Sequence, residues 1–272
     1  MSGNFDFTFI SFGAGVQSTA LLVCSALGLH GVPHADAAVF ADTGDEPAYV
    51  YQHLERMTAW AAERGIRVDR VSKGVLSEWV VNRRRQGRFV TVPLHTNNGD
   101  GSDGMLRRQC TVEFKVQPII KHVRQLIGVK PRHKVRIRVR GLIGISADEI
   151  YRMKPSRERW ITHEWPLVDA GLTREACKRI VREQGLPEPQ RSACGYCPYH
   201  SDAEFLRLQR EHPADFAKAV AFDRLVRDMT WRGIRGPAFV HRSLKPLEEV
   251  DFDPMRDQGD LFAADCEGMC GI

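Results

Sequence analysis

Short apolar runs alternate with helical patterns in the first part of the chain. Phe7 to Phe12 and Ala35 to Ala41 are apolar runs of strand length, and Ile66 to Val71 gives a third predicted strand. The intervening segments, Leu21 to Leu27 and Ala48 to Arg64, carry apolar residues at helical spacing. Alternating strands and helices are typical of a mostly parallel sheet.

The middle of the chain combines basic segments with further elements. Residues 76–88 predict a basic helix, residues 95–104 a flexible loop, and residues 113–128 another helix. In residues 135–140 Val or Ile alternates with Arg, which predicts a strand with one basic face. That strand is expected to continue into the apolar residues 141–145.

The last third of the chain changes in character. Residues 165–168 predict one more short strand, and Thr173 is placed to cap a helix that reaches Gln184. Beyond about residue 190 no strand pattern is found, and residues 201–230 predict helix.

Together these patterns predict an α/β fold with a doubly wound, mostly parallel sheet. The sheet domain is expected over residues 1–190. A smaller, mainly helical region with a cysteine-containing mobile tail is expected over residues 191–272. A chain of 272 residues is long enough to bury one large core and a smaller appendage.

Composition narrows the environment and the class of partner. With 43% hydrophobic and 27% charged residues, no signal-peptide pattern and no apolar run near 18 residues, we expect a cytoplasmic protein without a membrane partner. Seven cysteines are an odd count, which in a reducing compartment favours ligands or catalytic thiols over disulfides. The net charge of +5 favours an anionic partner, a nucleotide or a nucleic acid.

Residues 13–19, GAGVQST, join the first predicted strand to its helix. A strand, a glycine-containing turn and a helix N-terminus together direct backbone N–H groups at an anion. Gly13 and Gly15 are expected to supply positive φ and close backbone approach, and Ser18 and Thr19 to add hydroxyl donors. An ordinary turn between a strand and a helix is the alternative.

A second candidate segment, Asp42-Thr43-Gly44, follows the second predicted strand. The carboxyl ends of strands are where open α/β sheets bind ligands. An Asx-type turn that caps the next helix is the alternative.

A third candidate segment runs from Gly144 through Ser146, Asp148 and Glu149 to Arg152. A hydroxyl and two carboxylates after a strand suit contacts with a ribose or with Mg²⁺. The same residues suit a plain helix N-terminus, and both interpretations can hold together.

Cysteines provide the candidate sulfur or metal chemistry. Cys194 and Cys197 form a C-x-x-C motif before a proline, a spacing that suits an iron–sulfur cluster, zinc or a redox dithiol. Cys110 lies far upstream. Cys266 and Cys270 lie on a polar, glycine-containing tail where burial is not expected.

The glycine-containing turn resembles the pyrophosphate loop of the ATP pyrophosphatase and phosphoadenylyl-sulfate (PAPS) reductase superfamily, commonly S-G-G-x-D-S. Ala14 stands where that pattern has a glycine, and Gln17 where it has an aspartate. The Ser-Phe-Gly opening from Ser11 and the glutamine look more like the reductase branch. Walker A and the dinucleotide fingerprint fit less well, because the turn lacks a lysine and a third glycine.

The other segments resemble the same family in the same order. Residues 42–44 look like its second motif, residues 109–118 like its cysteine–lysine–proline segment, and residues 144–149 like the segment flanking the nucleotide. The tail partly matches a mobile Glu-Cys-Gly motif of PAPS reductases. Over almost its whole length the chain is thus similar to the PAPS reductase family within the adenine-nucleotide α-hydrolase (ATP pyrophosphatase, PP-loop) superfamily.

This resemblance implies a Rossmann-like sheet that binds an adenine nucleotide, and it implies roles for individual residues. The implied nucleotide-binding residues are Ser11, Gly13, Gly15, Gln17, Ser18, Thr19, Asp42, Thr43, Gly44, Gly144, Ser146 and Arg152. The implied ligands of a [4Fe–4S] cluster are Cys110, Cys194 and Cys197, with the fourth ligand open and with zinc or redox thiols as alternatives. The implied nucleophile is Cys266 or Cys270.

Two reactions follow from the resemblance. In the first, a tail cysteine attacks the sulfur of a sulfonucleotide (PAPS or APS), and an external thiol reductant then releases sulfite. In the second, ATP, with Mg²⁺ as a candidate cofactor, adenylates a nucleobase or a tRNA or DNA acceptor, and sulfur supplied by a donor and held at the iron–sulfur cluster displaces AMP. A non-catalytic nucleotide- or nucleic-acid-binding protein with a structural metal is the third interpretation.

Arginine clusters leave the class of anionic partner open, and a homodimer is left open as well. These arginines suit either phosphate groups or a solvated face, and no aromatic base-stacking motif accompanies them. They are Arg83, Arg84, Arg85, Arg88, Arg107 and Arg108.

Overall fold

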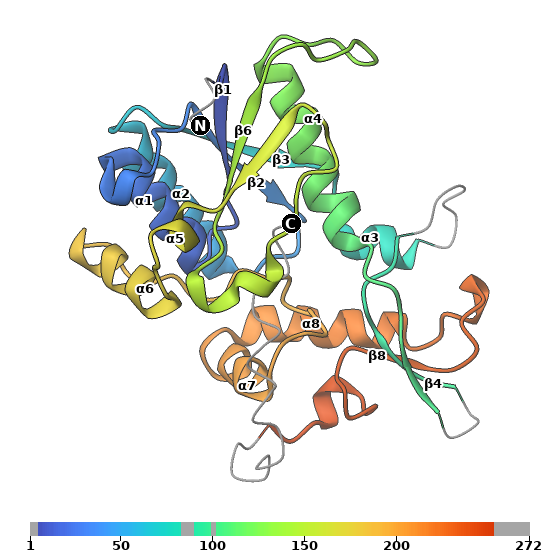
Figure 1. Ribbon diagram of the computed structural model, residues 1–272. Helices are drawn as coiled ribbons and strands as arrows, with labels where there is room; N and C mark the ends of the chain where they lie inside the picture. Colours follow the sequence, from blue (N-terminus) through green and yellow to red (C-terminus); the bar gives the residue numbers. More distant parts are fainter. Residues whose placement is uncertain (1–4, 83–89, 99–101, 253–272) are drawn as a thin grey trace.

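A computed structural model describes residues 5–82, 90–98 and 102–252. Its centre is a five-stranded sheet in the order β3-β2-β1-β6-β7, with every neighbouring pair parallel (Figure 1). The α/β class and the parallel sheet are therefore confirmed. The strands are β1 (Phe7–Ser11), β2 (Ala37–Asp42), β3 (Arg67–Ser72), β6 (Val139–Ile143) and β7 (Ile161–Glu164).

Helices cover both faces of this sheet because its central strands are apolar on both sides. Ile10 and Phe40 pack into one hydrophobic cluster, while their neighbours Phe9 and Val39 pack into another. The first cluster is covered by α1 (Val16–Leu27), α2 (Ala48–Ala62) and α6 (Arg174–Glu183). The second is covered by α4 (Gln117–Leu126), which lies on the opposite side of the sheet in Figure 1.

The strand order reverses beside β1. The chain places β2 and β3 on one side of β1, and β6 and β7 on the other. Ser11 at the end of β1 pairs in register with Ile143 at the end of β6. In open α/β sheets, ligands bind outside the carboxyl ends of strands at such a reversal. The turns that follow Ser11 and Ile143 are therefore the first place to look for a site.

A third hydrophobic cluster lies below the sheet in Figure 1. Leu76 and Phe114 pack there with residues from 194–252, including Phe205 and Phe222. The helices that contribute are α3 (Leu76–Val81), α7 (Asp202–Glu211) and α8 (Pro213–Val226), so the predicted helix over 201–230 is confirmed in the main. The domain boundary at residue 190 stays a prediction.

Shorter helical segments connect these elements. They are η1 (Leu29–Gly31), the π-helical η2 (Thr111–Val116), η3 (Ala147–Arg152), α5 (Pro166–Asp169), η4 (Thr230–Arg232) and η5 (Leu247–Glu249). No helix in the described part of the chain is long and apolar enough to cross a membrane.

The loop prediction for residues 95–104 was wrong in part. His95–Asn97 (β4) and Asp103–Met105 (β5) pair as antiparallel strands, and Ala238–Phe239 (β8) adds a third strand beside β4. Thr96 is buried at the centre of this small sheet. The partner that stabilises β4 lies about 140 residues away in the sequence, so local composition could not reveal it.

Two strand predictions were displaced. Residues 161–164 form β7, and the predicted strand at 165–168 is instead largely the short helix α5, which begins at Pro166. Proline favours the first turn of a helix and lacks the N–H that a ladder needs. The strand predicted over 135–140 begins only at Val139, because β1 starts at its partner Phe7 and offers no ladder to residues 135–138.

Candidate functional site

The turn after β1 has a different backbone from the one expected. Positive φ falls on Ala14 (φ 57°), whereas Gly15 is extended at φ −99° and precedes the first residue of α1. A Cβ added at Gly15 would meet no atom within 4 Å. The Gly15 N–H donates to the Ser18 hydroxyl at 3.2 Å, which closes the first turn of the helix. The glycine at position 15 thus leaves open space at a helix N-terminus.

The third candidate segment, which follows β6, packs against this turn at Gly144. A Cβ at position 144 would lie 2.9 Å from both the Cα and the backbone nitrogen of Ser18. Contacts this short with backbone atoms cannot be relieved by moving a side chain, so only glycine fits. The structure therefore brings together the segments after β1 and β6 that the sequence assigned to one site.

Gln17 links these two segments through a buried polar network. Its amide nitrogen donates to the Glu149 carboxylate at 3.1 Å and lies 3.5 Å from the Ser146 hydroxyl. Its amide oxygen accepts from Arg174 at 3.3 Å. Arg152, also buried, donates to the same carboxylate of Glu149. A neutral amide suits this position because one side of it faces a carboxylate and the other a guanidinium.

Two opposing effects act on the pKa of the Glu149 carboxyl group. Burial raises the pKa of the Glu149 carboxyl, while the Arg152 and Arg174 guanidinium groups act in the opposite direction. The network fixes Arg152 at the edge of the neighbouring cavity, which this side chain also lines.

Thr19 occupies a different environment from Ser18. It is fully buried, and its hydroxyl lies 2.9 Å from the Nε2 of His53 on α2. That hydroxyl therefore contributes to the packing of α1 on α2, and its assignment to a nucleotide stays a prediction.

The segment after β2 is an ordered turn. The Asp42 carboxylate accepts hydrogen bonds from Arg70 at 2.7 Å, from the Tyr51 hydroxyl at 2.8 Å and from the Gly44 N–H at 2.8 Å. Gly44 has φ 77°, and a Cβ there would lie 3.0 Å from the Val75 Cα. The Asx-type turn expected as the alternative is present, and the nucleotide role of residues 42–44 stays a prediction.

A cavity of about 450 Å³ opens between α4 and the carboxyl ends of β1 and β6. Its apolar lining comes from Phe9, Ile119, Ile143 and Ile161. Ser11 and Arg152 also line it, so two of the predicted nucleotide-binding residues lie at the cavity.

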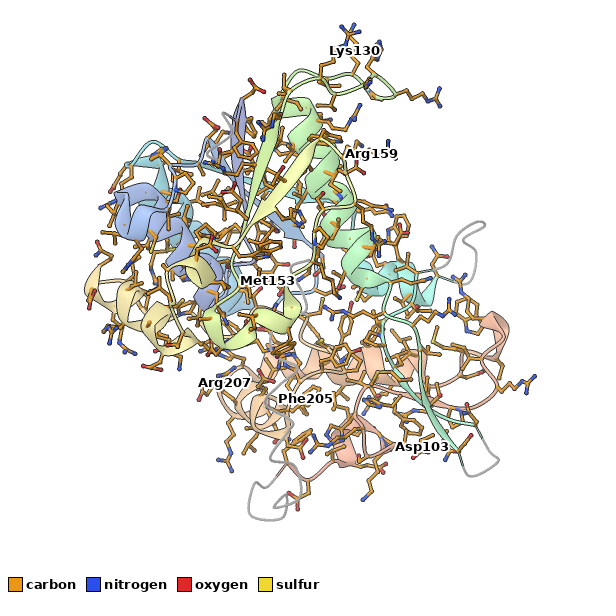
Figure 2. The ribbon with its side chains drawn as sticks, in the orientation of Figure 1. Asp103, Lys130, Met153, Arg159, Phe205 and Arg207 are labelled. Atoms are coloured by element: carbon orange, nitrogen blue, oxygen red, sulfur yellow. The ribbon has the colours of Figure 1, made fainter. Side chains whose placement is uncertain are left out.

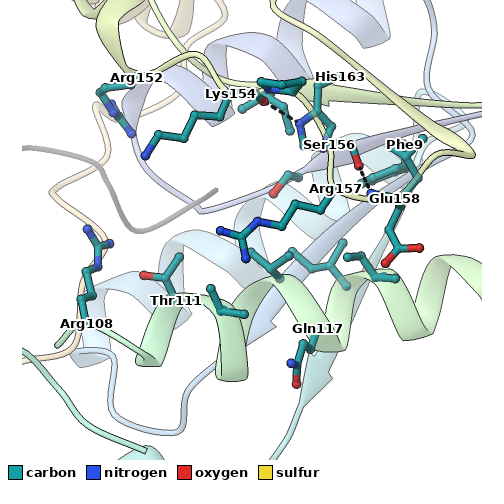
Figure 3. Close-up of a pocket in the computed structure, with 18 residues that line it drawn as sticks. Phe9, Arg108, Thr111, Gln117, Arg152, Lys154, Ser156, Arg157, Glu158 and His163 are labelled. Carbon is teal, nitrogen blue, oxygen red and sulfur yellow. Dashed lines mark hydrogen bonds between the residues drawn. The ribbon is translucent and has the colours of Figure 1, made fainter.

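Four cationic side chains surround one end of this cavity. Figure 3 shows the charged ends of Arg108, Arg152, Lys154 and Arg157 around the same space, with Arg108 entering from the side of α4. The segment that carries Lys154 and Arg157 is ordered by local hydrogen bonds, including one between His163 and the Lys154 carbonyl. The cavity therefore combines an apolar wall with a concentration of positive charge.

Sequence reasoning missed half of this cation set. Arg152 was assigned and Arg108 was noted among the clustered arginines, but Lys154 and Arg157 were not singled out. Their usable signal is a basic stretch that directly follows the Gly144–Arg152 segment.

The C-x-x-C motif lies beside the Asp42–Gly44 turn. Cys194 is buried, and its Sγ lies 3.2 Å from the Thr43 hydroxyl. The Cys197 N–H donates to the Cys194 carbonyl at 2.9 Å, so the motif is a tight turn. Cys110, just before the π-helical turn η2, packs against the same hydrophobic cluster as Cys194.

Burial raises the pKa of the Cys194 thiol well above its ordinary value, and the Glu46 carboxylate adds to the effect. Lys115, which pairs with Glu46 at 3.1 Å, opposes it only in part. Cys194 is therefore poorly suited to be a nucleophilic thiolate.

Among residues 5–82, 90–98 and 102–252, no group of three or more His, Cys, Asp or Glu could hold a metal ion. The cluster and the zinc alternative stay predictions. Cys266, Cys270 and the arginines at 83–85 and 88 lie outside the described residues.

Comparison with known proteins adds no assignment. No protein-family model matches this chain, and no curated protein matches it at a significant level. The functional argument therefore rests on the site alone.

Proposed function

We propose that this protein is a sulfonucleotide reductase of the PAPS reductase type, with the doubly wound, Rossmann-like fold of the adenine-nucleotide α-hydrolases. Its substrate in this proposal is PAPS or APS, bound at the carboxyl ends of β1 and β6. A cysteine of the C-terminal tail is the nucleophile.

The observation that carries the proposal is the cationic cavity beside the glycine turn. A sulfonucleotide has a planar base and several acidic oxygens close together. The wall of Phe9, Ile119 and Ile143 suits the base, and the cations at the other end suit phosphate and sulfate oxygens. Guanidinium groups bind such oxygens in pairs, which orients the ligand as well as attracting it.

The remaining residues position these groups. Glu149 holds Arg152, and Gln17 couples Glu149 to the first turn of α1. The open space at Gly15 lets a phosphate oxygen approach the helix N-terminus, where the helix dipole favours negative charge.

The reaction then needs a reactive thiolate that the buried motif does not supply. In the proposed step a tail thiolate attacks the sulfur of the substrate and forms an S–S bond. The bond between that sulfur and the bridging phosphate oxygen breaks, and the nucleotide leaves with the electron pair. A dithiol reductant then attacks the tail cysteine's sulfur, releases sulfite and becomes a disulfide. No step depends on a metal cluster.

Turnover by the full chain tests this proposal. Anaerobic protein with a dithiol reductant is incubated with PAPS, APS or ATP, and sulfite, AMP and pyrophosphate are measured. The proposal predicts sulfite from PAPS or APS, and its loss on truncation before Asp265 with nucleotide binding retained. Sulfite release at the normal rate by the truncated chain would overturn the assigned nucleophile. Pyrophosphate and AMP from ATP, without sulfite from either sulfonucleotide, would favour the sulfurtransferase alternative.

A further inference from the structure

A strongly basic surface lies at the opposite end of the sheet from the cationic end of the cavity. The sequence contains no Asp or Glu between Glu113 and Asp148. The loop between α4 and β6, residues 127–138, lies within this acid-free stretch and projects beyond the amino end of β6 (Figure 1). Its exposed cations are Lys130, Arg132, Lys134, Arg136 and Arg138.

The loop has a defined shape. Arg124 on α4 donates to the carbonyls of Lys130 at 3.2 Å and His133 at 2.6 Å, and the His133 N–H donates to the Lys130 carbonyl at 3.2 Å. The backbone at its tip is therefore held in a defined shape, which reduces the ordering cost of binding a ligand.

The acids nearest this surface make other contacts. Asp6 accepts a hydrogen bond from the Arg138 N–H at 2.8 Å. Asp69 pairs with Arg67 and His122, and Glu164 pairs with Arg140. Within the part of the chain that the structure describes, no ion pair involves Lys130, Arg132, Lys134 or Arg136.

One more cation extends the surface along β7. The Val139 N–H donates to the Trp160 carbonyl at 3.0 Å, which places the segment before β7 next to the end of the loop. Arg159 in that segment is exposed, and Figure 2 shows it on the same upper part of the molecule as Lys130. We call Lys130, Arg132, Lys134, Arg136, Arg138 and Arg159 the basic loop surface.

We propose that the basic loop surface binds the phosphate backbone of a nucleic acid. A cluster of exposed Lys and Arg side chains on a segment without acidic residues is the footprint of backbone binding. The large hydrophobic side chains exposed in the described residues are Leu27, Met105, Ile150, Tyr151 and Leu225, none of them on this surface. Apolar anchoring to a membrane is therefore disfavoured.

The type of contact follows from the side chains present. Residues 115–147 contain no Phe, Tyr or Trp, so the loop offers no base-stacking platform. Contacts to phosphates alone carry no sequence information. We therefore expect binding that tolerates a duplex, depends little on sequence and weakens steeply with salt. This inference is independent of the reaction proposed above, and a loss of sulfite release would leave it unaffected.

Fluorescence anisotropy with labelled duplex and single-stranded DNA and RNA, over a series of salt concentrations, tests the surface. The variant K130A/R132A/K134A/R136A removes four exposed cations from the loop. The matched control R179A/R210A/K218A/K245A removes the same charge from α6, α7, α8 and the segment after β8, all at exposed positions. Circular dichroism melting checks that both variants fold, and the double variant K130A/R132A at the loop tip replaces the first if it does not.

The wild-type chain is expected to bind duplex with an affinity that falls as salt rises. The loop variant should lose at least about tenfold in affinity. Its negative slope of log K against log salt should become shallower by roughly three to four. The control should change both quantities little. Equal losses in the two variants would show that net charge alone drives binding. No duplex binding at about 100 mM salt, or binding to anionic vesicles in place of nucleic acid, would overturn the proposal.

Discussion

Single residues decide how the turn after β1 can work. Ala14 takes the positive φ that a glycine would adopt without strain, while Gly15 keeps open space at the helix N-terminus. Gly144 is required for packing, because its hydrogen atoms lie against the backbone of Ser18. The two glycines thus differ: Gly144 is needed for the fold, and Gly15 is proposed to leave room for the ligand.

Gly15 and Gly144 therefore predict opposite outcomes. Gly15→Val should leave the melting temperature nearly unchanged, because a Cβ at this position would meet no atom within 4 Å, but it should weaken nucleotide binding at least about tenfold. Gly144→Ala should lower the melting temperature through its clash with Ser18. Calorimetric titration and thermal melting measure the two effects. Unchanged nucleotide affinity in folded Gly15→Val would remove the turn from the site.

The contact between Gln17 and Glu149 predicts that the stability of the fold depends on the charge at position 17. Gln17→Glu would place a carboxylate against Glu149, 3.1 Å from the present amide nitrogen, and should cost about 1–3 kcal/mol of the free energy of unfolding. Glu149→Gln in the same chain removes the like charge and should recover part of that loss. Urea unfolding of the two single variants and the double variant gives the coupling. Strictly additive losses would show that the two side chains do not interact.

At the level of elements, α1 and α2 are joined by the buried pair Thr19–His53. Burial lowers the pKa of His53 from 6.5 to about 4, and the Arg56 guanidinium adds to the effect. The imidazole is neutral in the folded chain at pH 5, where the unfolded chain would bind a proton. Stability from this group is therefore full above pH 6.5 and is lost as the pH falls towards 4.

The His53 effect can be isolated with one substitution. His53→Gln should flatten the dependence of the free energy of unfolding on pH between 4 and 6.5, relative to the wild type, by at most about 3 kcal/mol. Urea unfolding at several pH values measures it. A wild-type and variant difference that stays constant across this range would contradict a buried neutral imidazole.

Elements with strong local patterns were predictable from the sequence, and elements defined by distant partners were not. The apolar runs of β1 and β2 and the Thr173 cap of α6 were correct because short-range residues specify them. The strand β4 depends on pairing with β8, and β6 begins where β1 can pair with it. The neighbouring residues in the sequence therefore specify neither β4 nor the start of β6. Pro166 marked a helix start, but the apolar residues after it outweighed that signal in the strand prediction.

The same limit applies to the site. The resemblance assigned Ser18 and Gly144 to one nucleotide site, and the structure places the Gly144 backbone against Ser18. The convergence of Arg108 with Lys154 and Arg157 needs α4 on one face and the segment before β7 at the same cavity. Such long-range placement has no short sequence pattern.

At the scale of the whole molecule, we predict that the protein contains an iron–sulfur cluster held by Cys110, Cys194 and Cys197, which the fold alone does not test. Protein prepared without oxygen should contain iron and acid-labile sulfide, and each of the three serine variants should lose it because thiolates hold such clusters. Cys177→Ala, at a fully buried core cysteine on α6, is the control. Iron retained in all three serine variants would rule out these ligands, and zinc without iron would favour the zinc alternative.

The sheet order brings the turns after β1 and β6 to one edge, and the cationic cavity opens beside them. Calorimetric titration with adenosine 3′,5′-bisphosphate, which cannot react, tests most directly whether this cavity binds the nucleotide. We predict binding to the wild-type chain, a loss of at least about tenfold in Lys154→Ala/Arg157→Ala, and wild-type affinity in the charge-matched control Arg179→Ala/Lys245→Ala. Equal affinity in the two double variants, or no binding to the wild-type chain, would contradict the account.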